Sequence, residues 1–172
     1  MARLRKFCAY RRLERPYTRR SKFTEKSYIK ANPNIKIVRF EMGNQKKAYD
    51  SKLNLRAKSD IQIRHEALES ARQTANRFLE ARIGKGDYFL KILIYPHHVL
   101  RENPLAAGAG ADRMSTGMKR SFGKPMGLAA RVIKDQTIFQ VKVNKKHVAA
   151  AKRALHRASY KLPVSCRIEI TK

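Results

Sequence analysis

The residues best suited to chemistry in this sequence are two adjacent histidines and two nearby acids: His97, His98, Glu102 and Asp112. Imidazole and carboxylate ligands around a divalent ion can hydrolyse phosphodiesters, so such a cluster would indicate a metal-dependent nuclease. Adjacent residues of an extended strand point to opposite faces, however, so His97 and His98 do not easily reach one ion. We therefore predict no metal site and expect both histidines to hydrogen-bond backbone or phosphate groups.

A glycine-rich stretch at 104–125, PLAAGAGADRMSTGMKRSFGKP, partly matches phosphate-binding loops. GAGADR lacks the third glycine of G-x-G-x-x-G, and GMKRSFGKP has five residues rather than four between its glycines. Pro125 also stands where a P-loop has Ser or Thr. Ser115 and Ser121 have no positioned base. The sequence therefore predicts no nucleotide cofactor and no catalytic residue.

Positive charge is the dominant feature of the chain. Its 172 residues hold 40 Lys and Arg against 13 Asp and Glu, a net charge of +27. Such a chain would repel itself strongly unless a polyanion neutralised it. No helix-turn-helix pattern, zinc-finger spacing or basic zipper points to DNA, whereas basic arms with scattered aromatic residues suit folded RNA. We predict an RNA-binding protein.

Hydropathy and cysteine usage indicate the cellular compartment in which the protein works. There is no apolar run long enough for a membrane span and no signal-peptide pattern. Cys8 and Cys166 lie far apart without a C-x-x-C pair, which suggests neither a zinc site nor a disulfide framework. We expect an intracellular, cytoplasmic protein that does not engage a membrane.

We expect one domain at 34–172, which contains the helices and strands that position the basic residues. A basic RNA-binding extension, 1–33, precedes it. The extension has no helical or strand period and mixes Lys and Arg with aromatic residues, so we expect it to order on RNA; a solvated, disordered tail is the alternative. The domain contains a long internal loop, 101–126, because no secondary-structure period runs through that segment.

Hydrophobic periodicity predicts the secondary structure of the domain. Strands are expected at 34–40, 52–59, 87–96, 127–134, 137–143 and 164–170, with 134–136 as the turn of a hairpin. One helix is expected from an N-cap at Ser59 or Asp60 to a stop at Gly84, and another from Asn144 to Pro163. The pattern indicates an α+β fold, a two-layer domain of mostly antiparallel strands with two main helices.

Three segments resemble a known family: EALESARQTANRFL at 66–79, YPHHVLREN at 95–103 and AGADRMSTGMKRSFGKPMGLAARV at 109–132. They are similar to the L-sixteen family of large-subunit ribosomal proteins in its archaeal and eukaryotic L-ten-e form, and the resemblance covers essentially the whole chain. It implies an α/β-hammerhead fold and a place on large-subunit rRNA near the A-site tRNA corridor and the peptidyl-transferase centre. Peptide transfer would belong to RNA, so no enzyme is expected.

The resemblance also implies partners and site residues. The partners are large-subunit rRNA, A-site tRNA with P-site tRNA as a second candidate, neighbouring ribosomal proteins, and subunit export and maturation factors. The expected rRNA-binding residues are Arg3, Arg5, Lys6, Arg11, Arg12, Arg15, Arg19, Arg20, Lys22 and Lys124. Lys145 and Lys146 join them on a separate physical ground: they lie at the N-terminal end of the second predicted helix, where the macrodipole disfavours cations unless a phosphate is bound. The residues expected in the loop near tRNA and the peptidyl-transferase centre are Arg101, Ala109, Gly110, Asp112, Arg113, Met114, Gly117, Lys119 and Arg120.

Two alternatives stay open at this point. One is a metal-dependent RNA-processing enzyme built on the histidines and acids described first. The other is a non-ribosomal RNA chaperone that uses the same basic arms without a fixed site. The leading expectation is a structural constituent of the large ribosomal subunit that supports tRNA accommodation and late subunit maturation.

Overall fold

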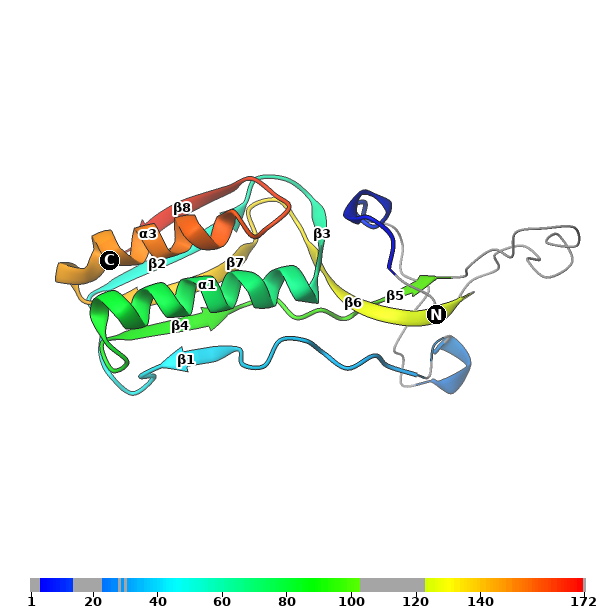
Figure 1. Ribbon diagram of the computed structural model, residues 1–172, viewed down its shortest axis with the longest axis horizontal. Helices are drawn as coiled ribbons and strands as arrows, with labels where there is room; N and C mark the ends of the chain where they lie inside the picture. Colours follow the sequence, from blue (N-terminus) through cyan, green and yellow to red (C-terminus); the bar gives the residue numbers. More distant parts are fainter. Residues whose placement is uncertain (1–3, 14–22, 28, 30, 103–122, 172) are drawn as a thin grey trace, which may run out of the picture.

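Two antiparallel sheets and two helices make up the fold over the described residues, which confirms the predicted α+β class (Figure 1). The computed structural model describes residues 4–13, 23–27, 29, 31–102 and 123–171. Both helices and the larger sheet lie at one end of an elongated molecule, and the smaller sheet extends from them toward the N-terminal segment.

The larger sheet has five strands in the order β1-β4-β7-β2-β8. Their bounds are β1 Glu41–Gly43, β2 Ser51–Ala57, β4 Tyr88–Ile92, β7 Thr137–Val143 and β8 Cys166–Thr171. In the β2–β7 pair, Leu53 opposes Val141 and Leu55 opposes Phe139, and all four side chains are fully buried. This register gives the sheet one continuous apolar face.

Two helices, α1 (His65–Ile83) and α3 (Val148–Ser159), lie side by side on that face (Figure 1). Each helix buries one stripe of apolar residues: Leu68, Ala71, Ala75 and Leu79 in α1, and Ala151, Ala154, Leu155 and Ala158 in α3. The stripes recur every three or four residues, so they fall on one side of a helix and define the core. Helix α1 ends at Ile83, directly before the predicted stop at Gly84, where a φ of 94° favours glycine.

The smaller sheet has three strands in the order β3-β6-β5. Their bounds are β3 Ile61–Arg64, β5 His98–Glu102 and β6 Lys124–Val132. Three short 3₁₀ turns complete the described elements: η1 Phe7–Ala9, η2 Thr24–Lys26 and η3 Lys145–His147.

The predicted strand at 34–40 is wrong, because this segment is extended but forms no strand; its one backbone hydrogen bond to β4 runs from Ile92 N–H to the carbonyl oxygen of Phe40 at 2.9 Å, directly before β1. Two of its backbone amides are satisfied by side chains of α1 instead. Lys36 N–H donates to His65 Nδ1 at 3.2 Å, and Val38 N–H donates to Glu69 Oε2 at 3.3 Å. Ile37 is buried against the core, so the alternating pattern reported burial rather than strand pairing.

The start of the first predicted helix is also wrong. Residues 61–64, expected in its first turn, form strand β3, and neither Ser59 nor Asp60 caps a helix. β3 pairs with β6, where Ile63 opposes Ala130, and Gln62 N–H donates to the carbonyl oxygen of Arg11 at 3.1 Å. Tertiary pairing on two sides therefore overrides the local preference for a longer helix.

The predicted hairpin around 134–136 is wrong as well, since β6 and β7 belong to different sheets. Asp135 has a φ of 66°, and its N–H donates to the carbonyl oxygen of Ala57 at 2.9 Å. This turn leads the chain from one sheet into the other. At the other end of β6, residues predicted to be loop lie in strands: Arg101 opposes Pro125 and Glu102 opposes Lys124.

Other element ends also differ from prediction: β2, β6 and β8 end or begin within three residues of the predicted bounds, and β4 and α3 are shorter. The strand predicted at 87–96 ends at Ile92. The side chain of Asn144 makes no capping hydrogen bond; η3 follows it, and α3 ends at Ser159, before Pro163. Strand β7 has the bounds that the sequence predicts.

Replacing Glu69 with glutamine should lower the free energy of unfolding in a pH-dependent way. Its buried carboxylate accepts from Arg72 Nε at 2.8 Å and Nη2 at 2.5 Å, and these hydrogen bonds lower the pKa of Glu69. Stability from the ionised group is fully present above the unfolded carboxyl's pKa near 4.5 and is lost as pH falls through the lower folded pKa. We expect Glu69→Gln to cost about 1–2 kcal/mol at pH 7.

Urea unfolding at a series of pH values would measure this difference, which should shrink below about pH 4. Glu80→Gln is a suitable control because Glu80 is exposed on the same helix and should change stability by less than about 0.5 kcal/mol. A cost for Glu69→Gln that stayed constant at acid pH would contradict the assignment.

Candidate RNA-binding surface

The N-terminal segment, residues 4–13, packs on the smaller sheet through a small apolar cluster of its own. Tyr10 is 8% exposed and packs with Leu100 of β5 and Ala129 of β6, and Leu4 lies against the same cluster. A Cβ on Gly127 would lie 3.1 Å from Leu4 Cδ1, so a glycine leaves room for Leu4. Residues 4–13 of the predicted extension are therefore held by contacts within the protein.

A buried carboxylate joins this segment to the end of β5. Glu102, 9% exposed, accepts from Arg5 Nε at 3.0 Å and from the hydroxyl of Tyr10. Burial, with the hydrogen bond to Glu102, raises the pKa of Tyr10 and keeps its hydroxyl a donor. The guanidinium groups of Arg5 and Arg64 lie 5.8 and 5.6 Å from the Tyr10 ring centre. We call Arg5, Tyr10 and Glu102 the N-terminal lock.

The two histidines serve separate structural contacts. His98 Nδ1 contacts Oε1 of Gln62, whose Nε2 donates to the carbonyl oxygen of Tyr10 at 2.9 Å. Burial, with nearby Arg131 and Arg101, lowers the pKa of His98 to about 4, so its ring is neutral near pH 7. The His97 ring packs on Tyr95 at 4.5 Å between centroids. His98 Nδ1 thus contacts a side-chain amide, and a contact of either histidine with phosphate stays a prediction.

These contacts leave the nuclease hypothesis without support. Glu102 already accepts from Tyr10 and Arg5. Asp112 lies outside the described residues. Among the residues that the structure does describe, no three His, Cys, Asp or Glu side chains come together in a way that could hold a metal ion.

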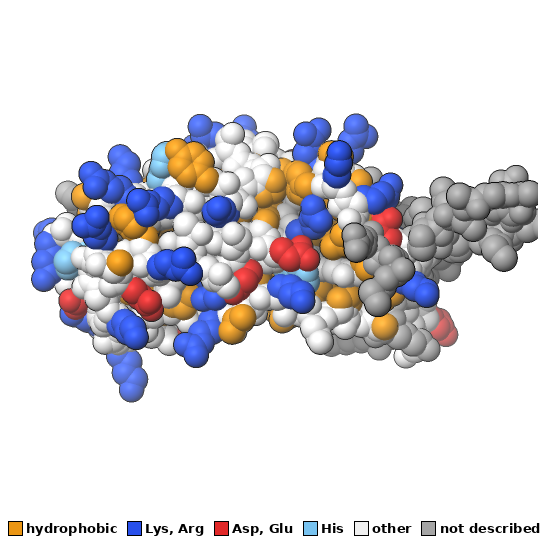
Figure 2. All heavy atoms as spheres, in the orientation of Figure 1, with side chains coloured by type: hydrophobic (Ala, Val, Ile, Leu, Met, Phe, Trp, Pro, Cys, Tyr) orange, Lys and Arg blue, Asp and Glu red, His pale blue; other side chains and the backbone are white. Residues whose placement is uncertain are grey.

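Exposed cations surround the N-terminal lock and continue over the molecule. Figure 2 shows Lys and Arg side chains distributed across the helix-covered face, with few acids between them. Lys6, Arg11 and Arg12 are exposed beside the lock, and the Arg5 side chain stays 67% exposed while it binds Glu102. Exposed cations at a fixed backbone suit phosphate contacts, because their position is set before RNA arrives.

The remaining predicted contacts fall into two groups. The described ones are Arg101, half-buried in β5; Lys124, exposed at the start of β6; and Lys145 and Lys146, exposed in η3. The others lie outside the described residues: Arg3, Arg15, Arg19, Arg20, Lys22, Ala109, Gly110, Asp112, Arg113, Met114, Gly117, Lys119 and Arg120.

Lys145 and Lys146 lie in η3, before α3, and not on the first turn of a helix that starts after Asn144. A neighbouring acid lies close by: Asp87 binds Lys47 Nζ at 2.5 Å, and Lys47, with smaller contributions from Lys146 and His147, lowers the pKa of Asp87. This acid offsets part of the local positive charge. The pair of lysines therefore remains a weaker candidate than the cations beside the lock.

Sequence reasoning missed two features of this surface. The partnership of Tyr10 with Glu102 spans 92 residues and carries no local pattern. A second group of cations is also absent from the predicted contacts: Arg77 and Arg82 on α1, Arg157 on α3 and Lys161 just after α3. Its signal was the polar faces of the two predicted helices.

The fold and this surface define a class of protein: a strongly basic α+β fold with a preformed cationic surface, of the kind that binds structured RNA. The chain belongs to the ribosomal protein L16p/L10e family, whose model matches residues 13–169. That family consists of ribosomal proteins and not of enzymes.

Archaeal relatives support the assignment over nearly the full chain. The large ribosomal subunit protein uL16 of Methanococcus maripaludis (strain C5) is 48% identical over 155 residues, which cover 90% of each chain. The protein of that name from Staphylothermus marinus is 52% identical over 153 residues, 89% of this chain and 84% of the relative. The Archaeoglobus fulgidus protein is 47% identical over 163 residues, 95% and 90% of the two chains.

No helix within the described parts of the chain is long and apolar enough to cross a membrane.

Both cysteines are free thiols. Cys8 is exposed, and burial raises the pKa of the half-buried Cys166 to about 11. Neither thiol is therefore paired in a disulfide.

Proposed function

We propose that this chain is a structural constituent of the large ribosomal subunit that binds rRNA through its N-terminal segment. In this proposal, the cations beside the N-terminal lock neutralise rRNA phosphates, and the segment between β5 and β6 faces the A-site tRNA corridor near the peptidyl-transferase centre. The protein supports accommodation of A-site tRNA by positioning and performs no chemistry of its own.

The observation that carries this proposal is the position of the N-terminal lock. Glu102 is the last residue of β5 and stands directly before the segment 103–123, and Arg5 and Tyr10 bind it. The N-terminal segment and β5 lie at the same end of the molecule (Figure 1). Binding of rRNA by one segment would therefore fix the base of the other.

Further contacts extend the proposal. Lys124 stands at the start of β6, opposite Glu102, and would meet rRNA at the same end as the lock. Lys145 and Lys146 would meet rRNA at η3. P-site tRNA is a second candidate at the segment between β5 and β6. Family resemblance adds neighbouring ribosomal proteins and the factors of late subunit export and maturation as partners.

Neutralising three cations beside the lock should weaken rRNA binding and reduce its salt dependence. The variant Lys6→Gln/Arg11→Gln/Arg12→Gln removes three exposed charges without touching the buried contacts of Tyr10. The slope of log affinity against log salt should fall by roughly 0.7–0.9 for each phosphate that is no longer neutralised. Filter binding of a large-subunit rRNA transcript at several salt concentrations measures both quantities.

A matched variant, Arg39→Gln/Lys58→Gln/Lys134→Gln, removes the same charge at exposed positions away from the lock. It should keep most of the wild-type slope. Equal slopes for the two variants would sink the proposed contact. Hydroxyl-radical footprinting of purified large subunits tests the location, since protection should map to the rRNA that borders the A-site corridor.

A further inference from the structure

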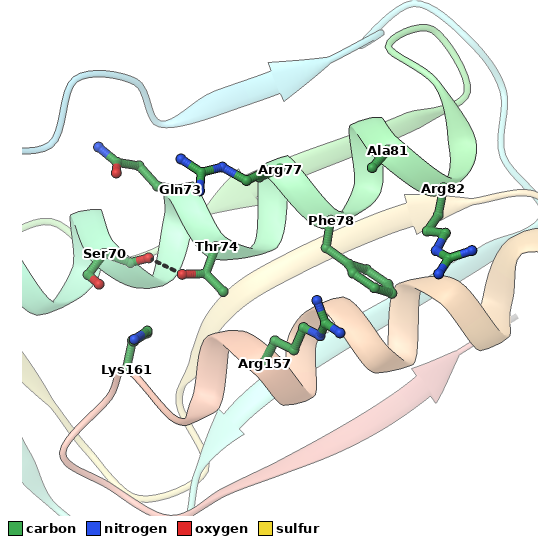
Figure 3. Close-up of a pocket in the computed structure, with 9 residues that line it drawn as sticks. All are labelled: Ser70, Gln73, Thr74, Arg77, Phe78, Ala81, Arg82, Arg157 and Lys161. Atoms are coloured by element: carbon green, nitrogen blue, oxygen red, sulfur yellow. Dashed lines mark hydrogen bonds between the residues drawn. The ribbon is translucent and has the colours of Figure 1, made fainter.

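A groove of about 560 Å³ runs between α1 and the end of α3 (Figure 3). Four cations line it: Arg77 and Arg82 come from α1, Arg157 comes from α3, and Lys161 follows α3. In the close-up, Arg157 and Phe78 point toward one another across the groove, and Lys161 lies near its other end, below Ser70.

No acid lines this groove among the residues that the structure describes, and the three acids of α1 are engaged elsewhere. Glu66 faces His65 at 3.4 Å, Glu69 binds Arg72, and Glu80 accepts from Asn76 at 3.1 Å. Helix α3 carries no acid. The four cations are thus not neutralised within the groove, which leaves a concentrated positive site.

The aromatic ring in the groove is already covered. The Arg157 guanidinium lies 4.4 Å from the centre of the Phe78 ring, within the range of a cation–π contact. Because Arg157 covers this face of the Phe78 ring, a nucleobase cannot stack on it. Two other polar side chains along α1 already donate within the helix, Thr74 Oγ1 to the carbonyl oxygen of Ser70 at 2.8 Å and Gln73 Nε2 to Glu69 Oε1 at 2.9 Å, so their oxygens are left to accept hydrogen bonds. These features suit a charged backbone, whose recognition does not depend on base identity.

We propose that the groove between α1 and α3 binds the sugar–phosphate backbone of folded rRNA as a second contact, separate from the N-terminal lock. This rests on the proposed function, in which the chain binds rRNA. Cations on both sides of the groove would contact phosphates, and hydroxyl and amide groups of α1 would contact ribose hydroxyls, as in shape-based recognition of RNA helices.

An acidic protein segment is the competing occupant, and the lining does not favour it. Protein interfaces are anchored at their centre by well-packed Trp, Tyr and Arg side chains that reach into the partner, and Lys, Asp and Glu are depleted there. Here the central arginine, Arg157, is held on the half-buried Phe78 ring of the same chain, and Ala81 is the other apolar side chain of the lining. The groove thus lacks a free anchor for a protein partner.

Three substitutions test the groove while leaving Arg157 on Phe78. Arg77, Arg82 and Lys161 are exposed, so Arg77→Gln/Arg82→Gln/Lys161→Gln should fold normally. For a large-subunit rRNA transcript, the slope of log affinity against log salt should decrease by roughly 0.7–0.9 per phosphate that these side chains neutralise in the wild type. The Arg39→Gln/Lys58→Gln/Lys134→Gln variant again serves as the equal-charge control.

The outcomes separate the two proposals. If the wild-type chain bound no rRNA, the proposed function itself would fail. Suppose that Lys6→Gln/Arg11→Gln/Arg12→Gln reduced the salt dependence of rRNA binding while the groove variant matched the control. Only the groove proposal would then be overturned. A photo-crosslinker at Ala81 in assembled large subunits should form an adduct with rRNA. An adduct with a neighbouring protein, or none with rRNA, would overturn the groove as an RNA contact.

Discussion

Tyr10→Ala is expected to release the N-terminal segment and to reduce rRNA affinity on the order of tenfold or more. The Tyr10 ring is 8% exposed and belongs to a cluster separate from the main core. Truncating a buried aromatic residue costs about 3–5 kcal/mol, and here also removes the hydroxyl that Glu102 accepts from. Because the cluster is separate, the loss should appear as local opening rather than global unfolding.

Two measurements would detect the release of the N-terminal segment. Limited trypsin digestion should cleave the variant faster at Lys6, Arg11 or Arg12, while the helices and larger sheet remain protected. Hydrogen exchange should accelerate at the amide of Gln62, which donates to the carbonyl oxygen of Arg11 in the folded protein. Affinity falls because RNA must then order a segment that the wild type holds in place before binding.

Tyr10→Phe is the matched control. It keeps the ring between Arg5 and Arg64 and removes only the hydroxyl, so the cost should be about 1 kcal/mol and the segment should stay docked. If Tyr10→Ala left trypsin cleavage and exchange at Gln62 unchanged, the lock would not hold the segment. In that case the rRNA contact would have to be explained without preorganisation.

Much of the larger sheet and both helices could be predicted because their signal is local. Strand β7 alternates from Phe139 to Val143, and Leu68, Ala71, Ala75 and Leu79 recur at helical spacing, so the period of each element can be identified from its own sequence. The same alternation at 34–40 misled, since Ile37 is buried while the neighbouring amides bond to side chains of α1. Periodicity reports which side chains are buried, and pairing is decided elsewhere in the chain.

In the candidate site, too, some features could be predicted from local sequence and others could not. Net charge predicted a polyanion partner, because charge is additive and needs no fold. The partners of each cation could not be predicted in this way: Arg5 binds Glu102 across 97 residues, and Arg157 covers Phe78 from another helix. β3 depends likewise on Arg11 and β6, both distant in sequence. Contacts of this kind follow from topology, which no local window contains.

Replacing residues 104–117 with a short Gly-Ser linker should leave the protein folded and strongly impair translation. Both apolar clusters form from described residues outside this segment, and β5 and β6 remain paired up to Glu102 and Lys124. We therefore expect the melting temperature of the isolated protein to change by no more than about 2 °C. If the segment positions tRNA, peptide synthesis by subunits carrying the variant should fall on the order of tenfold.

A scrambled segment of identical composition is the control for this replacement. It keeps the one arginine of the segment and the length of the chain but loses the order from Ala109 to Gly117, so it separates a specific contact from general charge. Both variants should bind rRNA with the wild-type salt slope, since the cations beside the N-terminal lock are intact. Normal peptide synthesis by the linker variant would refute a role in tRNA accommodation, and weak rRNA binding would instead place the segment in assembly.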